Sequence, residues 1–170
     1  MVSPTHILLV HGDSDSRQQI KKTLFAAGHS RITEADNGRS AVRALRNEAV
    51  DLLITDIAIP PLDGWRLGRM VRSGIFRCRS SIPLIIVATT WCERIAETTA
   101  REFGINMVIP FERLVQLPQA VEECLRSPLS IGQKPQLLVV EDCEDTAQLV
   151  DRILRSRFEV EITSDGQLGL

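Results

Sequence analysis

Short apolar runs alternate with amphipathic stretches along most of this chain, and this alternation limits the possible fold more than any other feature. The apolar runs have the length of buried strands and lie at 6–10, 30–35, 51–55, 82–90 and 106–110. The stretches between and after them have apolar residues at helical spacing and lie at 16–28, 37–49, 64–74, 92–104 and 112–127. Alternating strands and helices predict a parallel sheet covered by helices on both faces, a doubly wound α/β domain.

Composition and charge narrow the class of protein. With 44% hydrophobic and 25% charged residues and a net charge of −2, the chain is typical of a globular protein without a basic field for nucleic acid. No apolar run is long enough to span a membrane and no signal peptide opens the chain, so we expect a cytoplasmic protein that does not bind membranes. The cysteines and histidines show no metal-ligand spacing, which predicts reduced, structural thiols.

The stretch LLITDIAIPPLDGW, residues 52–65, places a carboxylate directly after a buried run. In open parallel sheets, ligands and chemistry lie outside the carboxyl ends of the strands. Asp56 is therefore the first candidate site residue. The prolines Pro60 and Pro61 shape the loop that follows, and Asp63 before Gly64 is typical of a helix N-cap.

Residues 5–126 resemble the receiver domain of two-component response regulators. The resemblance rests on ILLV, EADNGRSAVRAL, DLLITDIAIPPLDGW, IPLIIVAT and VIPF, taken together over the whole domain. It implies a flavodoxin-like, five-stranded parallel sheet with strand order 2-1-3-4-5. It also implies that Asp56 stands where the family accepts a phosphoryl group from a histidine kinase, as a carboxylate nucleophile.

The groups that assist this aspartate in the family are missing here. In the family, two acids after the first strand hold Mg²⁺, a hydroxyl after the fourth strand binds the phosphoryl group, and a lysine after the fifth pairs with its charge. His11 and Gly12 stand at the acid positions, Ala88 at the hydroxyl position and Ile109 at the lysine position. We therefore expect a degenerate receiver that is not an enzyme, holds no cofactor and transfers little or no phosphate.

Three neighbouring residues complete the cleft that we expect. Asp13 follows the acid positions by one residue, and its side chain is expected to point elsewhere. Thr89 lies one residue beyond Ala88, so strand alternation turns it to the opposite side. Pro110 follows a peptide bond that is cis in the family, so the resemblance implies a cis bond there.

Alternatives remain open at two of these positions. Asp56 is either a family relic or a slow acceptor in a working receiver with an unusual site. His11 is either a new ligand or proton switch, or a partly exposed residue that fills the space of a lost acid. A small-ligand domain is a third reading, with little support because no Gly-rich phosphate loop follows the first strand.

Partners are expected to be proteins, namely a histidine kinase or an output domain. The resemblance implies a surface formed by helix 4, strand 5 and helix 5, where Trp91, Ile95 and Val115 are candidates if exposed. Pro118 predicts a kink or a late start in the last helix.

The receiver pattern begins again after a Pro- and Ser-containing linker at 127–135. Residues 136–170 match the first β-α-β of a second receiver, and the acid pair is present there as Glu141 and Asp142. These acids predict Mg²⁺ binding only in a complete second receiver, so we expect a longer protein with receivers in tandem. The strand at 136–140 has a bare edge, which predicts either a homodimer through strand pairing or packing of this segment on the first receiver.

Overall fold

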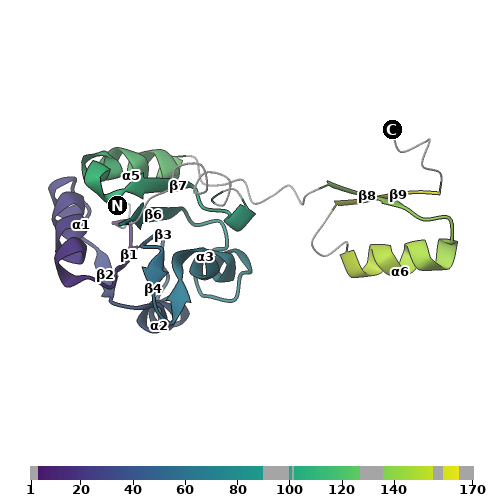
Figure 1. Ribbon diagram of the computed structural model, residues 1–170, viewed down its shortest axis with the longest axis horizontal. Helices are drawn as coiled ribbons and strands as arrows, with labels where there is room; N and C mark the ends of the chain where they lie inside the picture. Colours follow the sequence, from purple (N-terminus) through teal and green to yellow (C-terminus); the bar gives the residue numbers. More distant parts are fainter. Residues whose placement is uncertain (1–3, 90–99, 101, 127–135, 155–158, 165–170) are drawn as a thin grey trace. The chain divides into compact units, whose positions relative to one another are not determined.

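The computed structural model describes residues 4–89, 100, 102–126, 136–154 and 159–164 (Figure 1). The chain divides into two compact units, Met1–Leu129 and Ser130–Leu170. The predicted linker at 127–135 lies outside the described residues. None of the described helices has the length and apolar character needed to cross a membrane.

The first unit contains a five-stranded parallel sheet with the order β2-β1-β3-β6-β7. Its strands are β1 (Ile7–Val10), β2 (Ile32–Ala35), β3 (Leu52–Thr55), β6 (Leu84–Ala88) and β7 (Met107–Pro110). This order confirms the predicted flavodoxin-like, doubly wound fold. Val10 pairs in register with Thr55, so the residues that follow β1 and β3 meet at one edge of the sheet.

Helices cover both faces of this sheet (Figure 1). They are α1 (Ser14–Ala26), α2 (Gly38–Asn47), α3 (Gly64–Arg72) and α5 (Leu117–Arg126). A 3-10 segment, η1 (Phe111–Gln116), precedes α5, so the late start predicted from Pro118 is confirmed. Most of the helix predicted at 92–104 lies outside the described residues.

Alternate residues of each strand enter two separate cores. Leu8 and Val10 pack on the side of α2 and α3, whereas Ile7 and Leu9 pack on the side of α1 and α5. Period-two alternation in a sheet buried on both faces explains why the strands read as continuous apolar runs.

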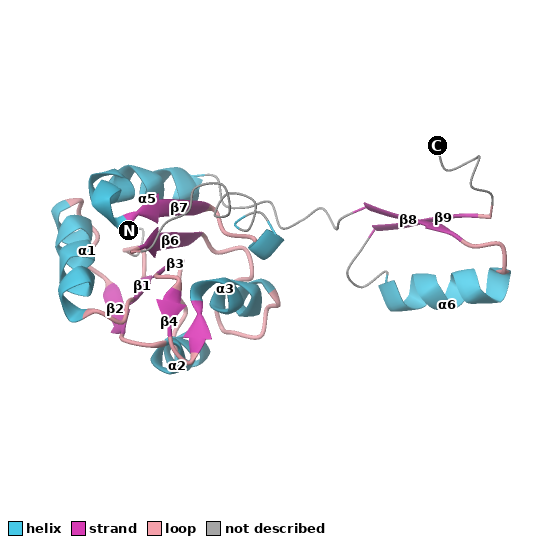
Figure 2. Ribbon diagram, in the orientation of Figure 1, coloured by secondary structure: helices cyan, strands magenta, loops and turns pink. Residues whose placement is uncertain are grey.

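A small antiparallel hairpin, which the sequence patterns did not predict, follows Asp56. It consists of β4 (Ala58–Ile59) and β5 (Leu62–Asp63) (Figure 2). Among the described residues, the one cis peptide bond lies in this hairpin, at Pro60–Pro61. The cis bond expected before Pro110 is wrong, because Pro60–Pro61 is the one cis bond among the described residues, which include Ile109 and Pro110.

The second unit is a β-α-β, as the sequence predicted. Strands β8 (Gln136–Val140) and β9 (Glu159–Thr163) are parallel and in register, and α6 (Glu144–Leu154) connects them. Within the described part of the chain, β8 pairs with β9 alone. Leu138 and Val140 are exposed, so one face of this small sheet carries uncovered apolar side chains.

Candidate functional site

Asp56 follows β3 at the carboxyl edge of the sheet, as predicted, and only 4% of it is exposed. The backbone N–H of Ile57 donates to its Oδ1 over 2.7 Å, and the backbone N–H of Thr89 reaches the same oxygen at 3.4 Å. Asp56 is therefore a buried carboxylate held by the ends of two strands.

His11 lies beside this carboxylate, at the end of β1. Its Nε2 atom is 3.8 Å from Oδ2 of Asp56. The expectation that His11 is partly exposed is wrong, because only 2% of it is accessible. Phe111, at the start of η1, lies 6.3 Å away between ring centroids, and its ring is tilted by 51° to the imidazole. The imidazole is thus a buried neighbour of Asp56.

A neighbouring backbone group holds the His11 ring. The N–H of Asp13 donates to Nδ1 of His11 over 3.1 Å. The other ring nitrogen, Nε2, is buried and has no hydrogen-bond partner among the described residues, and it lies 3.8 Å from Oδ2 of Asp56.

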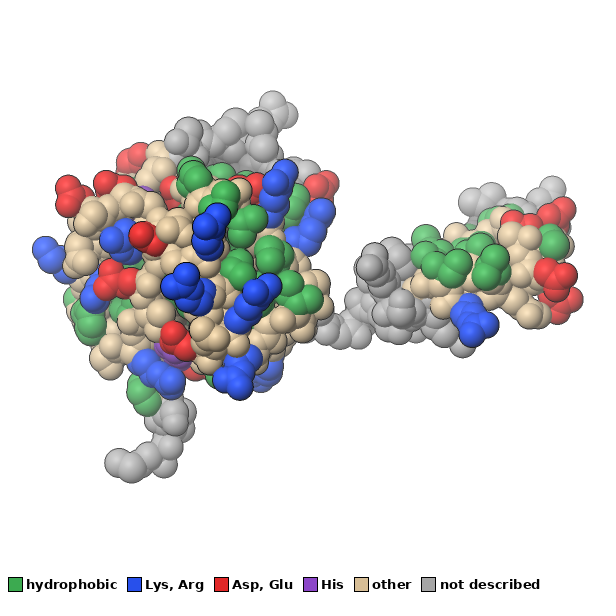
Figure 3. Space-filling model, turned by 90° about the horizontal axis from the view of Figure 1, so that it is seen from below, with side chains coloured by type: hydrophobic (Ala, Val, Ile, Leu, Met, Phe, Trp, Pro, Cys, Tyr) green, Lys and Arg blue, Asp and Glu red, His purple; other side chains and the backbone are tan. Residues whose placement is uncertain are grey.

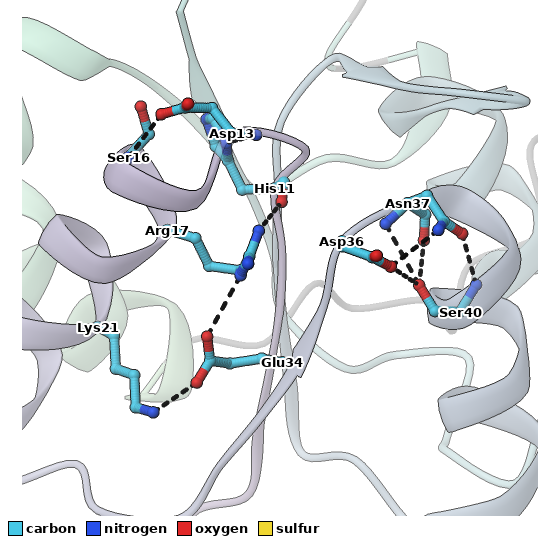
Figure 4. A network of polar contacts seen from close by, with 9 residues as sticks. All are labelled: His11, Asp13, Ser16, Arg17, Lys21, Glu34, Asp36, Asn37 and Ser40. Atoms are coloured by element: carbon cyan, nitrogen blue, oxygen red, sulfur yellow. Dashed lines mark hydrogen bonds and ion pairs between the residues drawn. The ribbon is translucent and has the colours of Figure 1, made fainter.

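Polar contacts hold the His11 loop in place (Figure 4). Arg17 donates from Nη1 to the carbonyl oxygen of His11 over 2.7 Å, and from Nε to Glu34 over 3.2 Å. Lys21 also donates to Glu34. The Lys21 hydrogen bond is the largest cause of the lowered pKa of Glu34, and Arg17 adds to it. The His11 backbone is therefore tied to α1 and β2.

Asp13 serves the helix and does not enter the cleft. Its Oδ2 accepts from the backbone N–H of Ser16 over 2.7 Å, so Asp13 is the N-cap of α1. The side-chain and backbone hydrogen bonds with Ser16 lower the pKa of Asp13. Asp63 caps α3 in the same manner, which confirms the predicted N-cap before Gly64.

The predicted orientation of the Thr89 side chain is wrong. Its Oγ1 hydroxyl donates to Oδ2 of Asp56 over 3.3 Å, so it does not face away. The alternation argument failed because β6 ends at Ala88, and the chain beyond it no longer follows the pleat. Ala88 itself is buried in one core and Ile109 in the other, so neither supplies a polar group.

The residues of this edge do not fit the Mg²⁺ site of the resemblance. Within the described residues, no group of three or more histidine, cysteine or acidic side chains is placed to hold a metal. Among the positions to which the resemblance assigns a role in metal binding or phosphotransfer, only that of Asp56 carries a carboxylate. A Cβ on Gly12 would lie 3.8 Å from its nearest neighbour, so space for a larger residue exists there although the ligand is missing.

Other predicted residues lie elsewhere in the chain. Glu141 and Asp142 follow β8 in the second unit, where Glu141 accepts from the N–H of Cys143 over 3.1 Å. Val115 in η1 is 85% exposed, and Trp91 and Ile95 lie outside the described residues. Sequence patterns missed Phe111 as a neighbour of the cleft, since it occupies no position to which the resemblance assigns a role.

Comparison with known proteins gives a consistent picture. The family model described as the response regulator receiver domain matches residues 7–113. The chemotaxis protein CheY homologue of Campylobacter jejuni is 35% identical over 129 residues, which cover 74% of this chain and 93% of that protein.

Solved structures agree with this match. The signal receiver domain of a histidine kinase from Syntrophus aciditrophicus has a TM-score of 0.62 at 26% identity, covering 78% of this chain and 98% of its own. A CheY-like receiver domain protein from Methanospirillum hungatei has a TM-score of 0.64 at 20% identity, covering 74% of this chain and 96% of its own, which shows a shared fold.

Proposed function

We propose a role for this chain from one premise: it belongs to the response regulator receiver domain family, which acts in two-component signalling. Its first unit serves as an interaction or regulatory module with little or no phosphotransfer. It is not an enzyme and holds no cofactor of its own. Its partners are proteins, namely a histidine kinase or an output domain.

The observation that carries this proposal is the contact between His11 and Asp56. Nε2 of His11 lies 3.8 Å from Oδ2 of Asp56, so an imidazole stands at the edge where the family places its metal-binding acids. A phosphoryl group on Asp56 would bring a charge of about −1.5 to −2 into a buried site. Ile109 stands at the lysine position, and His11 is the one basic side chain that forms an ion-pair contact with Asp56 among the described residues.

The size of the expected loss in rate supports weak phosphotransfer. Loss of one preorganised electrostatic group commonly lowers a rate by roughly 10²–10³. Here both the metal ligands and the lysine are replaced, and the replacements at Ala88 and Ile109 are buried and apolar. These losses act on the same developing charge.

A second candidate is a working receiver that accepts phosphate on Asp56. Hydrogen-bond donors around the carboxylate favour it, namely the N–H groups of Ile57 and Thr89 and the Thr89 hydroxyl. Such donors stabilise negative charge that develops on oxygen. In this candidate, Thr89 takes the part of the hydroxyl that Ala88 lacks.

Intact mass after incubation with acetyl phosphate and Mg²⁺ separates the two candidates. We expect no added phosphoryl group on the wild-type chain under conditions that label the variant H11D/G12D/I109K. The variant D56N in that background is the control for the site of labelling. Rapid labelling of the wild-type chain that the single substitution D56N abolishes would establish the second candidate.

The second unit extends the proposal. Glu141 and Asp142 follow β8 as the acid pair of a receiver follows its first strand. In a complete receiver these carboxylates would contribute the oxygen ligands that Mg²⁺ prefers. We infer a tandem arrangement in which the second receiver binds the metal and the first does not.

A further inference from the structure

A surface pocket lies beside α2, and neither Asp56 nor a residue of β7, η1 or α5 lines it. Its volume is about 410 Å³, and the residues that line it include Arg39, Arg43, Arg46, Val42, Pro61 and Leu62. The three arginines are exposed, and Val42 and Leu62 are half-buried. We name this group of six residues the α2 pocket. It combines positive charge with a small apolar floor.

Within the part of the chain that the structure describes, the arginines of the α2 pocket have no acidic partners. The helix α2 carries these three basic residues and no acidic one, and none of the three forms an ion pair among the described residues. Nearby acids are engaged elsewhere, with Asp36 bonded to Ser40 and Glu48 to Thr33. Like charges three and four residues apart destabilise a helix, so this arrangement is unfavourable in the free chain.

The opposite wall of the α2 pocket is held in place. The N–H of Gly38 at the start of α2 donates to the carbonyl oxygen of Pro60 over 3.3 Å. A Cβ on Gly38 would lie 2.8 Å from Cβ of Leu62, so only glycine permits this packing. The β4–β5 hairpin is therefore fixed against α2, and the pocket exists before any partner binds.

The surrounding surface reinforces the charge. Arg77 donates from Nη1 to the carbonyl oxygen of Asn47, at the end of α2, over 3.1 Å. Figure 3 views the first unit from the side of α2 and shows Lys and Arg side chains around a group of hydrophobic side chains. The whole chain has a net charge of −2, so this positive face is a local departure.

We propose that the α2 pocket docks an acidic segment of a protein partner, with one apolar side chain of that segment seated on Val42 and Leu62. Arg39 and Arg46 are seven residues apart, which separates them by about 10 Å along the helix. That span suits several carboxylates on a peptide better than one small anion. Guanidinium groups bind carboxylates in bidentate pairs, and apolar anchors in pockets provide much of the energy of an interface.

The apolar floor favours a peptide over nucleic acid. A phosphate backbone has no side chain to place on Val42, Pro61 and Leu62. No aromatic side chain lines the pocket for base stacking.

The test uses the full chain and a synthetic helical peptide, with glutamates spaced as Arg39, Arg43 and Arg46 are and one leucine between them. In an NMR titration we expect saturable shifts at residues 39–47 and 61–62. The variant R39E/R43E/R46E should weaken binding by at least about tenfold, a loss that one well-placed charge pair can account for. Replacing the leucine of the peptide by serine should weaken binding by about threefold or more.

A matched control separates docking from general charge attraction. The variant K22E/R31E/R113E changes the net charge equally at exposed positions outside the pocket and should bind as wild type does. The proposal is wrong if the control loses as much affinity as the pocket variant, or if no shifts appear. It is also wrong if duplex DNA or inorganic phosphate displaces the peptide from the same residues at equal concentration.

Discussion

Gly64 and Asp56 are in contact through their backbones: a Cβ atom on Gly64 would lie well under 3.0 Å from the carbonyl oxygen of Asp56. The N–H of Gly64 also donates to the carbonyl oxygen of Ile57 over 2.9 Å. The first turn of α3 therefore packs directly on the chain that carries the carboxylate.

The first prediction concerns this contact. Gly64→Ala should lower the free energy of unfolding by about 2–4 kcal/mol, because the new methyl group forces the backbone at Asp56 to move. Gly12→Ala is the control, since its Cβ meets only ordinary contacts, and its effect should stay below about 1 kcal/mol. Urea unfolding followed by circular dichroism measures both. Equal effects of the two variants would contradict the packing described for Gly64.

The second prediction concerns metal dependence. His11→Asp places a second carboxylate beside buried Asp56, so it should lower the free energy of unfolding by about 1–3 kcal/mol without Mg²⁺. Millimolar Mg²⁺ should restore most of the loss, whereas wild type and His11→Asn should not respond. Thermal unfolding with and without Mg²⁺ makes the comparison. A wild-type response as large as that of the variant would show that the cleft already binds the ion.

The third prediction concerns Arg72 at the end of α3. It donates to the carbonyl oxygens of Gly104, Ser80 and Ile82 at 2.8, 2.6 and 2.7 Å. Burial lowers its pKa to about 10, so it remains charged at pH 7.

Arg72→Met leaves these carbonyl groups without their donor and should cost about 2–4 kcal/mol of stability. The exposed Arg113→Met should change it by less than about 0.5 kcal/mol. Chemical unfolding measures both variants. A small effect of Arg72→Met would mean that solvent replaces its hydrogen bonds.

The fourth prediction concerns acid stability. The pKa of Glu34 is lowered in the folded chain, first by Lys21 and then by Arg17, from its ordinary value of 4.5. Its contribution is therefore present above pH 4.5 and is lost as the pH falls through the lowered value. Glu34→Gln should cost about 0.5–1 kcal/mol at pH 7 and progressively less in acid. Unfolding measured at several pH values checks this, with Glu112→Gln at an exposed position as the matched control variant.

The fifth prediction concerns the homodimer that we propose through β8. Lysine at an exposed strand edge opposes pairing with another chain. L138K/V140K should therefore shift the full chain toward monomer in light scattering, while L149K on exposed α6 should not. A wild-type chain that remains monomeric at high concentration would remove this proposal.

Strand order and the position of Asp56 were predictable, because five buried strands read as continuous apolar runs and the family pattern orders them. The β4–β5 hairpin was not, since strands of two residues have no periodicity. Thr89 was misplaced because the alternation of β6 was extended past its last residue, Ala88. Phe111, whose ring neighbours the buried His11, is distant from it in sequence, so a local pattern does not reveal this contact.

The short connection between β3 and α3 is held by a contact at each of its ends. At one end, Ile57 donates to Asp56, and at the other, Leu62 lies against Gly38 of α2. Surface loops usually vary freely in length among relatives. Contacts hold this connection at both ends. We therefore expect that insertions and deletions between Asp56 and Asp63 are not tolerated during evolution, even if Asp56 never accepts a phosphoryl group.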